Sequence, residues 1–244
     1  MKWQSMSTAS KGMRPTRNRI MIRVVLVVIG LGLWFLTQSL IGQRQNLEGD
    51  YDQVSDLLTR GDAGLMATDS LNRFLRENQN WSNVLLIGSS SVIDLLGGSL
   101  LLWAIFGPSI RPFIGLLILF GLRQLSQNLC VLPPPDGIIW EFPGFPSLLV
   151  TYSVANDFFF SGHTGIAVYG AIELGRMKGR KGVFWGIAIA LFEASSVLIL
   201  RAHYTMDVLT GILAAICAAY LANRIGPMVD RQIERRCESP LSDG

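Results

Sequence analysis

Six long apolar runs, separated by short polar stretches, set the pattern of this 244-residue chain. A helix needs about 20 residues to cross a hydrocarbon core of about 30 Å, and each run is close to that length. Glu173 and Glu193 interrupt the fourth and fifth runs, where a charge must face protein or water. The pattern predicts an all-α, polytopic membrane protein with six spans at residues 21–41, 84–106, 112–130, 158–175, 183–200 and 206–223.

Composition agrees with a bilayer as the solvent. Half of the residues are hydrophobic and only 16% are charged, which is unlike a soluble domain. The net charge of +3 comes from short basic clusters between apolar runs rather than from one basic face. We therefore expect no nucleic-acid partner.

The basic residues that cluster in the short flanks of the runs lie on one side. They precede the first span, separate the second from the third and the fourth from the fifth, and follow the sixth. By the positive-inside rule these segments are cytoplasmic. This predicts a cytoplasmic N-terminal segment (1–20), a six-span catalytic domain (21–223) and a cytoplasmic tail (224–244). A signal peptide is the alternative for the first run, but the run is long and no small-residue cleavage site follows it.

The segment from about 43 to 82 is acidic, which places it on the outer side, in the lumen or the exterior. Within it, residues 69–81 begin with good N-cap residues and put Leu71, Phe74 and Leu75 on one face of a helix. This pattern predicts an interfacial helix lying on the membrane. An ordinary extramembrane loop with one helical turn is the alternative.

Two polar clusters begin the fourth and sixth runs, NDFFFSGHT (156–164) and RAHYTMD (201–207). They contain both histidines of the chain, His163 and His203. Spans four and six both run inward from the outer face. The two histidines should therefore lie at a similar depth, although forty residues separate them.

His203 and Asp207 are spaced i, i+4, which puts both side chains on one face of a helix. The carboxylate can hold one ring nitrogen, fix the tautomer and stabilise positive charge on the ring. The other nitrogen is then free to attack phosphorus, as a histidine nucleophile requires. The alternative is a simple helix-end hydrogen bond.

Phosphoryl transfer also needs a proton for the leaving alkoxide and positive charge around the phosphate oxygens. His163 is the candidate proton donor, although a membrane histidine often only bridges helices. The candidate phosphate-binding residues come from the same two clusters. Arg201 is the guanidinium nearest to His203, and Ser161, Gly162 and Thr164 are at a helix N-terminus, which favours anions. Both histidines lie in polar clusters at one membrane face, which favours a two-step transfer through a phosphohistidine.

The outward half of the third span is polar and suggests the wall of a head-group pocket. It contains Arg123 and Asn128, with Gln124, Ser126 and Gln127 between them, and it is followed by LPPPDG (132–137). For Gln124 and Ser126, packing against neighbouring helices is the alternative. Asp94, Glu173 and Glu193 are interpreted as interhelical or cytoplasm-facing groups. The three cysteines have neither an even count nor a metal-like spacing, so they imply no zinc site and no disulfide framework. We expect no cofactor.

At these residues the chain resembles the lipid phosphatase and phosphotransferase (PAP2-like) superfamily, with its SGH motif and later HxxxD. SGHT (161–164), HYTMD (203–207) and the stretch 111–137 look like the branch of the sphingomyelin synthases and the plant phosphatidylcholine:diacylglycerol cholinephosphotransferases. LNRFLRENQNW extends the likeness to the plant enzymes upstream, so the resemblance covers roughly residues 65–223.

The resemblance implies a six-helix bundle of the PAP2/sphingomyelin synthase type, no metal, and a catalytic triad of His163, His203 and Asp207. It implies that His203 takes phosphocholine from phosphatidylcholine, that His163 protonates the departing diacylglycerol, and that a second diacylglycerol accepts the head group. Asp157, four residues before Ser161, joins the expected substrate-binding residues. The partners are then membrane lipids, and no particular oligomeric state is implied.

Several positions depart from the family patterns. Ala104 stands where the phosphatases usually carry a lysine, and Leu200 precedes Arg201 where they have a serine, which disfavours a simple phosphatase. Ala155 and Asn156 replace the Cys-Gly of sphingomyelin synthases, which disfavours ceramide as the acceptor. A lipid phosphate phosphatase or phospholipase C-like hydrolase remains the alternative enzyme, and a non-enzymatic lipid-binding protein the alternative class.

Overall fold

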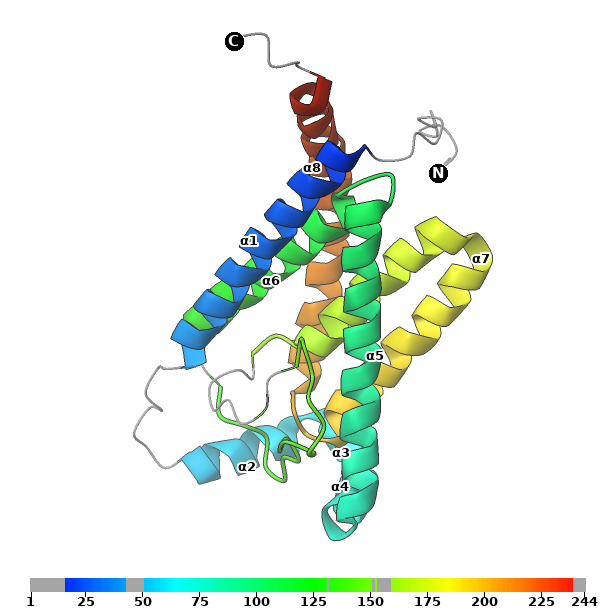
Figure 1. Cartoon of the computed structure of the whole chain (residues 1–244). Helices are drawn as coiled ribbons and strands as arrows, with labels where there is room; N and C mark the ends of the chain where they lie inside the picture. Colours follow the sequence, from blue (N-terminus) through cyan, green and yellow to red (C-terminus); the bar gives the residue numbers. More distant parts are fainter. Residues whose placement is uncertain (1–15, 43–50, 131, 151, 153–158, 239–244) are drawn as a thin grey trace, which may run out of the picture.

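The computed structural model describes residues 16–42, 51–130, 132–150, 152 and 159–238, and all regular elements in these ranges are helices (Figure 1). The predicted all-α class is confirmed. The helices are α1 (Arg17–Gly42), α2 (Tyr51–Gly61), α3 (Ala63–Ala67), α4 (Asp69–Glu77), α5 (Gln79–Phe106), α6 (Arg111–Leu129), α7 (Gly162–Ile199) and α8 (Thr205–Glu238).

Within the described residues, four helices are long and apolar enough to cross a membrane, namely α1, α5, α7 and α8. This supports a membrane protein but does not confirm the count of six spans. The 19-residue α6 is not among the four, since its outward half carries several polar residues. α7 contains residues 162–175 of the predicted fourth span and residues 183–199 of the predicted fifth span.

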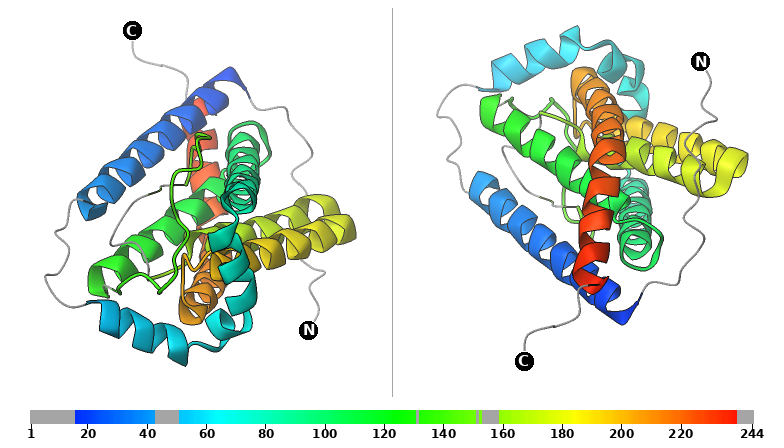
Figure 2. Two further views of the ribbon diagram at one scale, coloured as in Figure 1. Left: turned by 90° about the horizontal axis from the view of Figure 1, so that it is seen from below. Right: turned by 90° about the horizontal axis from the view of Figure 1, so that it is seen from above.

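Helix α7 is a hairpin of two helical arms. Its backbone leaves the helical region at Gly179, where φ is +60°, a left-handed conformation that glycine adopts without strain. The arms fold back on each other, as the two views of Figure 2 show. Small residues allow the close packing: a side chain at Gly186 would lie 2.6 Å from the Cα of Ala171. The hairpin therefore returns the chain to the end of the bundle where α7 began.

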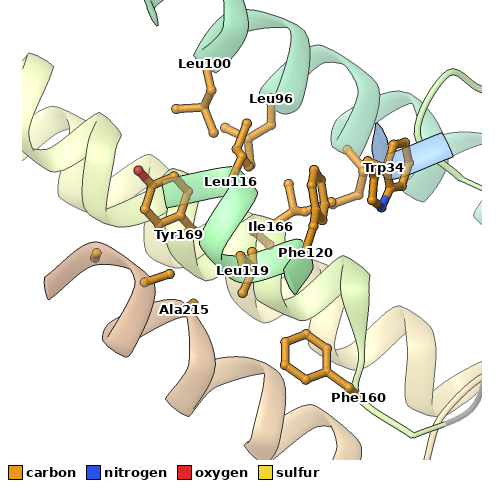
Figure 3. Close-up of a cluster of buried hydrophobic side chains, with 14 of the residues drawn as sticks. Trp34, Leu96, Leu100, Leu116, Leu119, Phe120, Phe160, Ile166, Tyr169 and Ala215 are labelled. Carbon is orange, nitrogen blue, oxygen red and sulfur yellow. The ribbon is translucent and has the colours of Figure 1, made fainter. Parts of the chain in front are cut away.

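The largest apolar core surrounds α6, which packs against α1, α5, α7 and α8 (Figure 3). Trp34 of α1 stacks on Phe120 of α6 with ring centroids 4.7 Å apart. Leu119 and Ile166 pack in the same cluster, and Phe160 closes it near the start of α7. Burial of these side chains fixes α7 and α8 relative to α6, and so fixes the starts of the two helices that carry the histidines.

Ion pairs hold the opposite end of the bundle, where α1 begins and α8 ends. The fully buried Glu173 carboxylate accepts hydrogen bonds from Arg111 and Arg176. Arg23, also fully buried, pairs with Asp230 at 2.7 Å. These charges are paired inside the protein, which avoids the cost of exposing them to hydrocarbon.

Two other acidic groups of the spans also have protein partners. Glu193 of α7 accepts a 2.6 Å hydrogen bond from Ser89 of α5. Asp94 of α5 accepts backbone N–H groups of Leu148 and Leu149 at 2.8 and 2.9 Å. Glu193 thus links two helices, and Asp94 holds the loop that leads toward α7.

Helices α2, α3 and α4 form a belt across the end of the bundle where α8 begins (Figure 1). The single helix predicted for residues 69–81 is wrong in its extent. The chain breaks at Asn78, so Trp81 belongs to α5. Leu71 and Phe74 are about half exposed and Leu75 is buried, consistent with an amphipathic α4. The sequence reading did not predict α2 and α3.

Candidate active site

The hairpin of α7 brings the two histidine motifs together. His163 is the second residue of α7, and His203 lies in the short connection between α7 and α8. The backbone N–H of Ser161 donates to the carbonyl of Asp207 at 3.1 Å, which joins the start of α7 to the start of α8. Both imidazoles are buried, with 8% and 6% exposure, and they lie close enough for their charges to interact.

His203 lies next to Asp207, but only Asp207 is on α8, which begins at Thr205, so the predicted placement of both residues on one helix is wrong. The Nδ1 atom of His203 lies 3.7 Å from Oδ2 of Asp207, which is longer than a hydrogen bond but within ion-pair range. The same Oδ2 accepts the backbone N–H of Tyr204 at 2.9 Å. Catalytic hydrogen bonds are often long before substrate binds. This geometry turns Nδ1 toward the carboxylate, with Nε2 on the other side of the ring.

His163 packs against an aromatic ring that was not predicted from the sequence to belong to the site. Trp140, from the loop between α6 and α7, meets the His163 ring edge-on with centroids 5.2 Å apart. Nε2 of His163 has no hydrogen-bond partner among the described residues. That nitrogen is the buried group of His163 that can exchange a proton with a substrate oxygen.

Ser161 is the N-cap of α7, Thr164 lies in its first turn, and both are fully buried. The Ser161 hydroxyl accepts from the Thr164 backbone N–H at 3.3 Å and donates to the Thr164 hydroxyl at 3.0 Å. The two predicted phosphate-binding hydroxyls are therefore engaged with each other. These hydrogen bonds fix the first turn of α7. The positive end of the α7 dipole therefore lies at the site, where it favours an anion.

Arg123 of α6 lies directly over this helix N-terminus. A side chain on Gly162 would come within 3.1 Å of its Nε atom, so Gly162 provides the space for the guanidinium. The Nη1 atom of Arg123 donates to Gln38 of α1 at 3.3 Å. Arg123 also lies near enough to His163 for an electrostatic interaction between the two side chains.

Arg201 is bound by the protein itself. Its Nη1 donates to the carbonyl of Asp136 and its Nη2 pairs with Asp69 of α4, both at 2.6 Å, and the residue is only 5% exposed. Asn72 of α4 reinforces this attachment by donating to the carbonyls of Gly137 and Ile199. The belt thus holds the 133–139 loop and the His203 loop together.

Two other residues predicted to bind substrate, Asn128 and Asp157, are not placed at the site by the described structure. Asn128 is exposed and donates to the carbonyl of Gln124 in its own helix at 2.6 Å, away from the buried face of α6. Its neighbour Gln127 is the buried amide, with 1% exposure. Asp157 lies outside the described residues. Among the described residues, no group of three acidic, histidine or cysteine side chains could hold a metal ion.

Each motif is preceded by a residue in the left-handed region. Phe160 has φ +82° three residues before His163, and Arg201 has φ +51° two residues before His203. These conformations are unfavourable for side chains with a Cβ and persist only where the surroundings enforce them. Core packing of Phe160 and the ion pair of Arg201 supply that enforcement.

The fold and the site define a helical membrane protein with two histidines and one carboxylate gathered at one end of the bundle. The family described as AtPDCT1/2 matches residues 61–224, a range that includes all three of these residues. The chain belongs to this family, which confirms the predicted resemblance.

A curated relative supports the same assignment. The chain is 24% identical over 172 residues to phosphatidylcholine:diacylglycerol cholinephosphotransferase 1 of Arabidopsis thaliana. The match covers 70% of this chain and 56% of that protein, so the chain spans a little over half the length of its relative. No solved structure matches the chain.

Proposed function

We propose that this protein transfers phosphocholine from phosphatidylcholine to diacylglycerol through a phosphohistidine on His203. The observation that carries the proposal is the burial of His203, Asp207 and His163 together at the N-terminus of α7. Family membership and the activity named for the Arabidopsis relative support the substrate class.

In the first step, Nε2 of His203 attacks the phosphorus of phosphatidylcholine and forms a P–N bond. The P–O bond to the glycerol backbone breaks, and protonated His163 gives its proton to the leaving alkoxide, which departs as diacylglycerol. Asp207 stabilises the positive charge that develops on the His203 ring. His163 is left neutral and ready to act as a base.

In the second step, a diacylglycerol hydroxyl loses its proton to His163 and attacks the same phosphorus. The new P–O bond forms as the P–N bond breaks, so His203 returns to its neutral state and His163 to its protonated state. When the second diacylglycerol differs from the first, the net result is exchange of acyl chains between the two lipid pools. No metal enters either step.

Positive charge for the phosphate oxygens comes from two sources in this proposal. The first is Arg123 over Gly162, and the second is the N-terminus of α7, ordered by Ser161 and Thr164. Arg201 contributes by holding the His203 loop, because both its terminal nitrogens bond to protein. Substrate binding by Asp157 and Asn128 stays a prediction from the sequence.

We further propose six spans, obtained by counting α6 and the two arms of α7 with α1, α5 and α8. Residues 21–223 then form the catalytic domain, and the basic segments 1–20 and 224–244 face the cytoplasm. The belt and the histidines share the opposite end of the bundle. The site would therefore open to the lumen or the exterior.

The test is a transfer assay with purified protein in mixed micelles, without added metal. Phosphatidylcholine labelled in its choline is supplied with diacylglycerol or ceramide. Label in new phosphatidylcholine supports the proposal, whereas label in sphingomyelin would make ceramide the acceptor. Label only in water-soluble phosphocholine would identify a hydrolase.

The matched variants are His203→Ala and Thr210→Val. Among the described residues, the Thr210 hydroxyl bonds to the Met206 carbonyl of its own helix alone, so Thr210→Val should transfer like the parent protein. His203→Ala should lose transfer but still bind lipid. Transfer retained by His203→Ala would refute the phosphohistidine route, and a parent protein that moves no label would favour a non-enzymatic lipid-binding role.

A further inference from the structure

Asp62, between α2 and α3 of the belt, bonds to two helix N-termini at once. Its Oδ1 accepts the backbone N–H groups of Gly64 and Leu65 at 3.0 Å each, which caps α3. Its Oδ2 accepts the backbone N–H of Thr205, the first residue of α8, at 2.8 Å. The Thr205 hydroxyl also donates to Oδ1. One carboxylate thus receives four hydrogen bonds, two of them from α8.

Thr205 lies midway between His203 and Asp207 in the sequence, so a bond to Thr205 acts on both. Its N–H is one of the first-turn groups that have no partner within the helix. Asp207 satisfies the N–H of Tyr204 and Asp62 satisfies that of Thr205. The first turn of α8 is therefore fixed from inside by Asp207 and from the belt by Asp62.

The chain leaves room for this contact. Gly64 faces Thr205, and a Cβ at position 64 would collide with the Thr205 hydroxyl. Carboxylates are favoured at helix N-termini because they interact well with the exposed N–H groups and the dipole. The carboxylate of Asp56, in the same belt, is about half exposed, and its one ion pair among the described residues is with Arg60, one turn along α2. Asp56 has none of these contacts to α8.

We infer that Asp62 is a positioning residue for the reaction: it fixes the first turn of α8 and thereby the separation of His203 from Asp207. The expected effect of Asp62 on the rate of transfer rests on the proposed function. Its expected effect on the orientation of the His203 ring does not. Asp62 does not act on the substrate. It acts through Thr205 on the orientation of the nucleophile.

The chain offers a direct readout, since it has only two histidines. Nitrogen-15 labelling of histidine in the full-length protein gives separate ring signals for His163 and His203, whose shifts report tautomer and hydrogen bonding. Asp62→Asn, which keeps the shape and removes the charge, is compared with Asp56→Asn. We expect Asp62→Asn to change the His203 ring signals and leave those of His163 in place, and Asp56→Asn to change neither.

In the transfer assay, Asp62→Asn should lower kcat by about 10- to 100-fold, the size expected when a reacting group is displaced by up to about 1 Å. The KM for phosphatidylcholine should be unchanged, because no binding contact is removed. An unchanged His203 spectrum in Asp62→Asn, or equal changes in both rings, would overturn the inference.

If Asp62→Asn does not fold, a second pair of variants tests whether Asp62 positions His203 through Thr205. Thr205→Val removes the hydroxyl that donates to Asp62, and Thr205→Ser retains it. Shifted His203 signals in Thr205→Val, restored in Thr205→Ser, would support the inference, and parental signals in Thr205→Val would overturn it. Failure of the proposed function would appear instead as transfer by His203→Ala, whatever the ring spectra show.

Discussion

Replacement of Asp207 by Asn removes the negative charge of the side chain but keeps an oxygen that can accept a hydrogen bond. Asp207 is fully buried, and its Oδ2 both accepts the Tyr204 N–H at 2.9 Å and lies 3.7 Å from Nδ1 of His203. An asparagine oxygen can still accept the Tyr204 N–H, so the first turn of α8 should persist. What is lost is the negative charge that stabilises the developing positive charge on His203.

The size of the loss follows from the distance. Two unit charges 3.7 Å apart attract by about 4 kcal/mol at an effective dielectric constant of about 20. Because each factor of ten in rate corresponds to about 1.36 kcal/mol, Asp207→Asn should slow formation of the phosphohistidine by about a thousandfold.

Single-turnover kinetics with labelled phosphatidylcholine measure this step directly, as label that becomes bound to the protein. Asp56→Asn serves as the control, since in the described part of the chain its carboxylate pairs with Arg60 alone. Thermal melting should show Asp207→Asn folded. A rate constant within about tenfold of the parent value would refute the role given to the carboxylate.

Three further outcomes are expected. Glu173→Ala should lower the free energy of unfolding by about 3 kcal/mol, because it leaves two arginines without their buried partner, and denaturant unfolding in detergent measures this. Gly211→Ala would place a Cβ 2.7 Å from the Ser161 carbonyl; it should push α7 from α8, cost about 1–3 kcal/mol of stability and lower transfer, and full activity in this variant would contradict the close packing. The pKa of Asp62 lies below its usual value of 3.8, because hydrogen bonds to the carboxylate outweigh the effect of burial, which alone would raise it. Its stabilisation is therefore complete above pH 3.8 and is lost as the pH falls through the lower folded-state pKa, so the difference in melting temperature between the parent and Asp62→Asn should shrink in acid.

The interruption of apolar runs by polar clusters was sufficient to predict helices, a membrane and a pair of histidines at one depth. His203 and Asp207 could be paired from their spacing of four residues, although His203 lies just before α8 and not on the helix that the spacing predicted. The family could be recognised because its motifs are short, ordered and rich in residues that an apolar run would otherwise exclude. These conclusions depend on local spacing, which the sequence states directly.

The partners of the charged groups could not be predicted in the same way. Arg201, two residues before the nucleophile, was predicted to bind phosphate, yet its guanidinium bonds to Asp69 and Asp136. Arg123 lies over the N-terminus of α7 only because Gly162, almost forty residues later in the chain, leaves the space. Each of these contacts joins residues far apart in sequence, and no periodic pattern encodes it.

The sequence by itself determined the helical class, the membrane setting and the three residues proposed for the chemistry, because hydrophobic periodicity and i, i+4 spacing are local properties of the chain. The tertiary structure decided how those residues are held. The hairpin at Gly179 returns α7 to its starting end, and the belt places Asp62 on Thr205. Such placements follow from the packing of the whole bundle, in which the burial of one helix face sets the position of another.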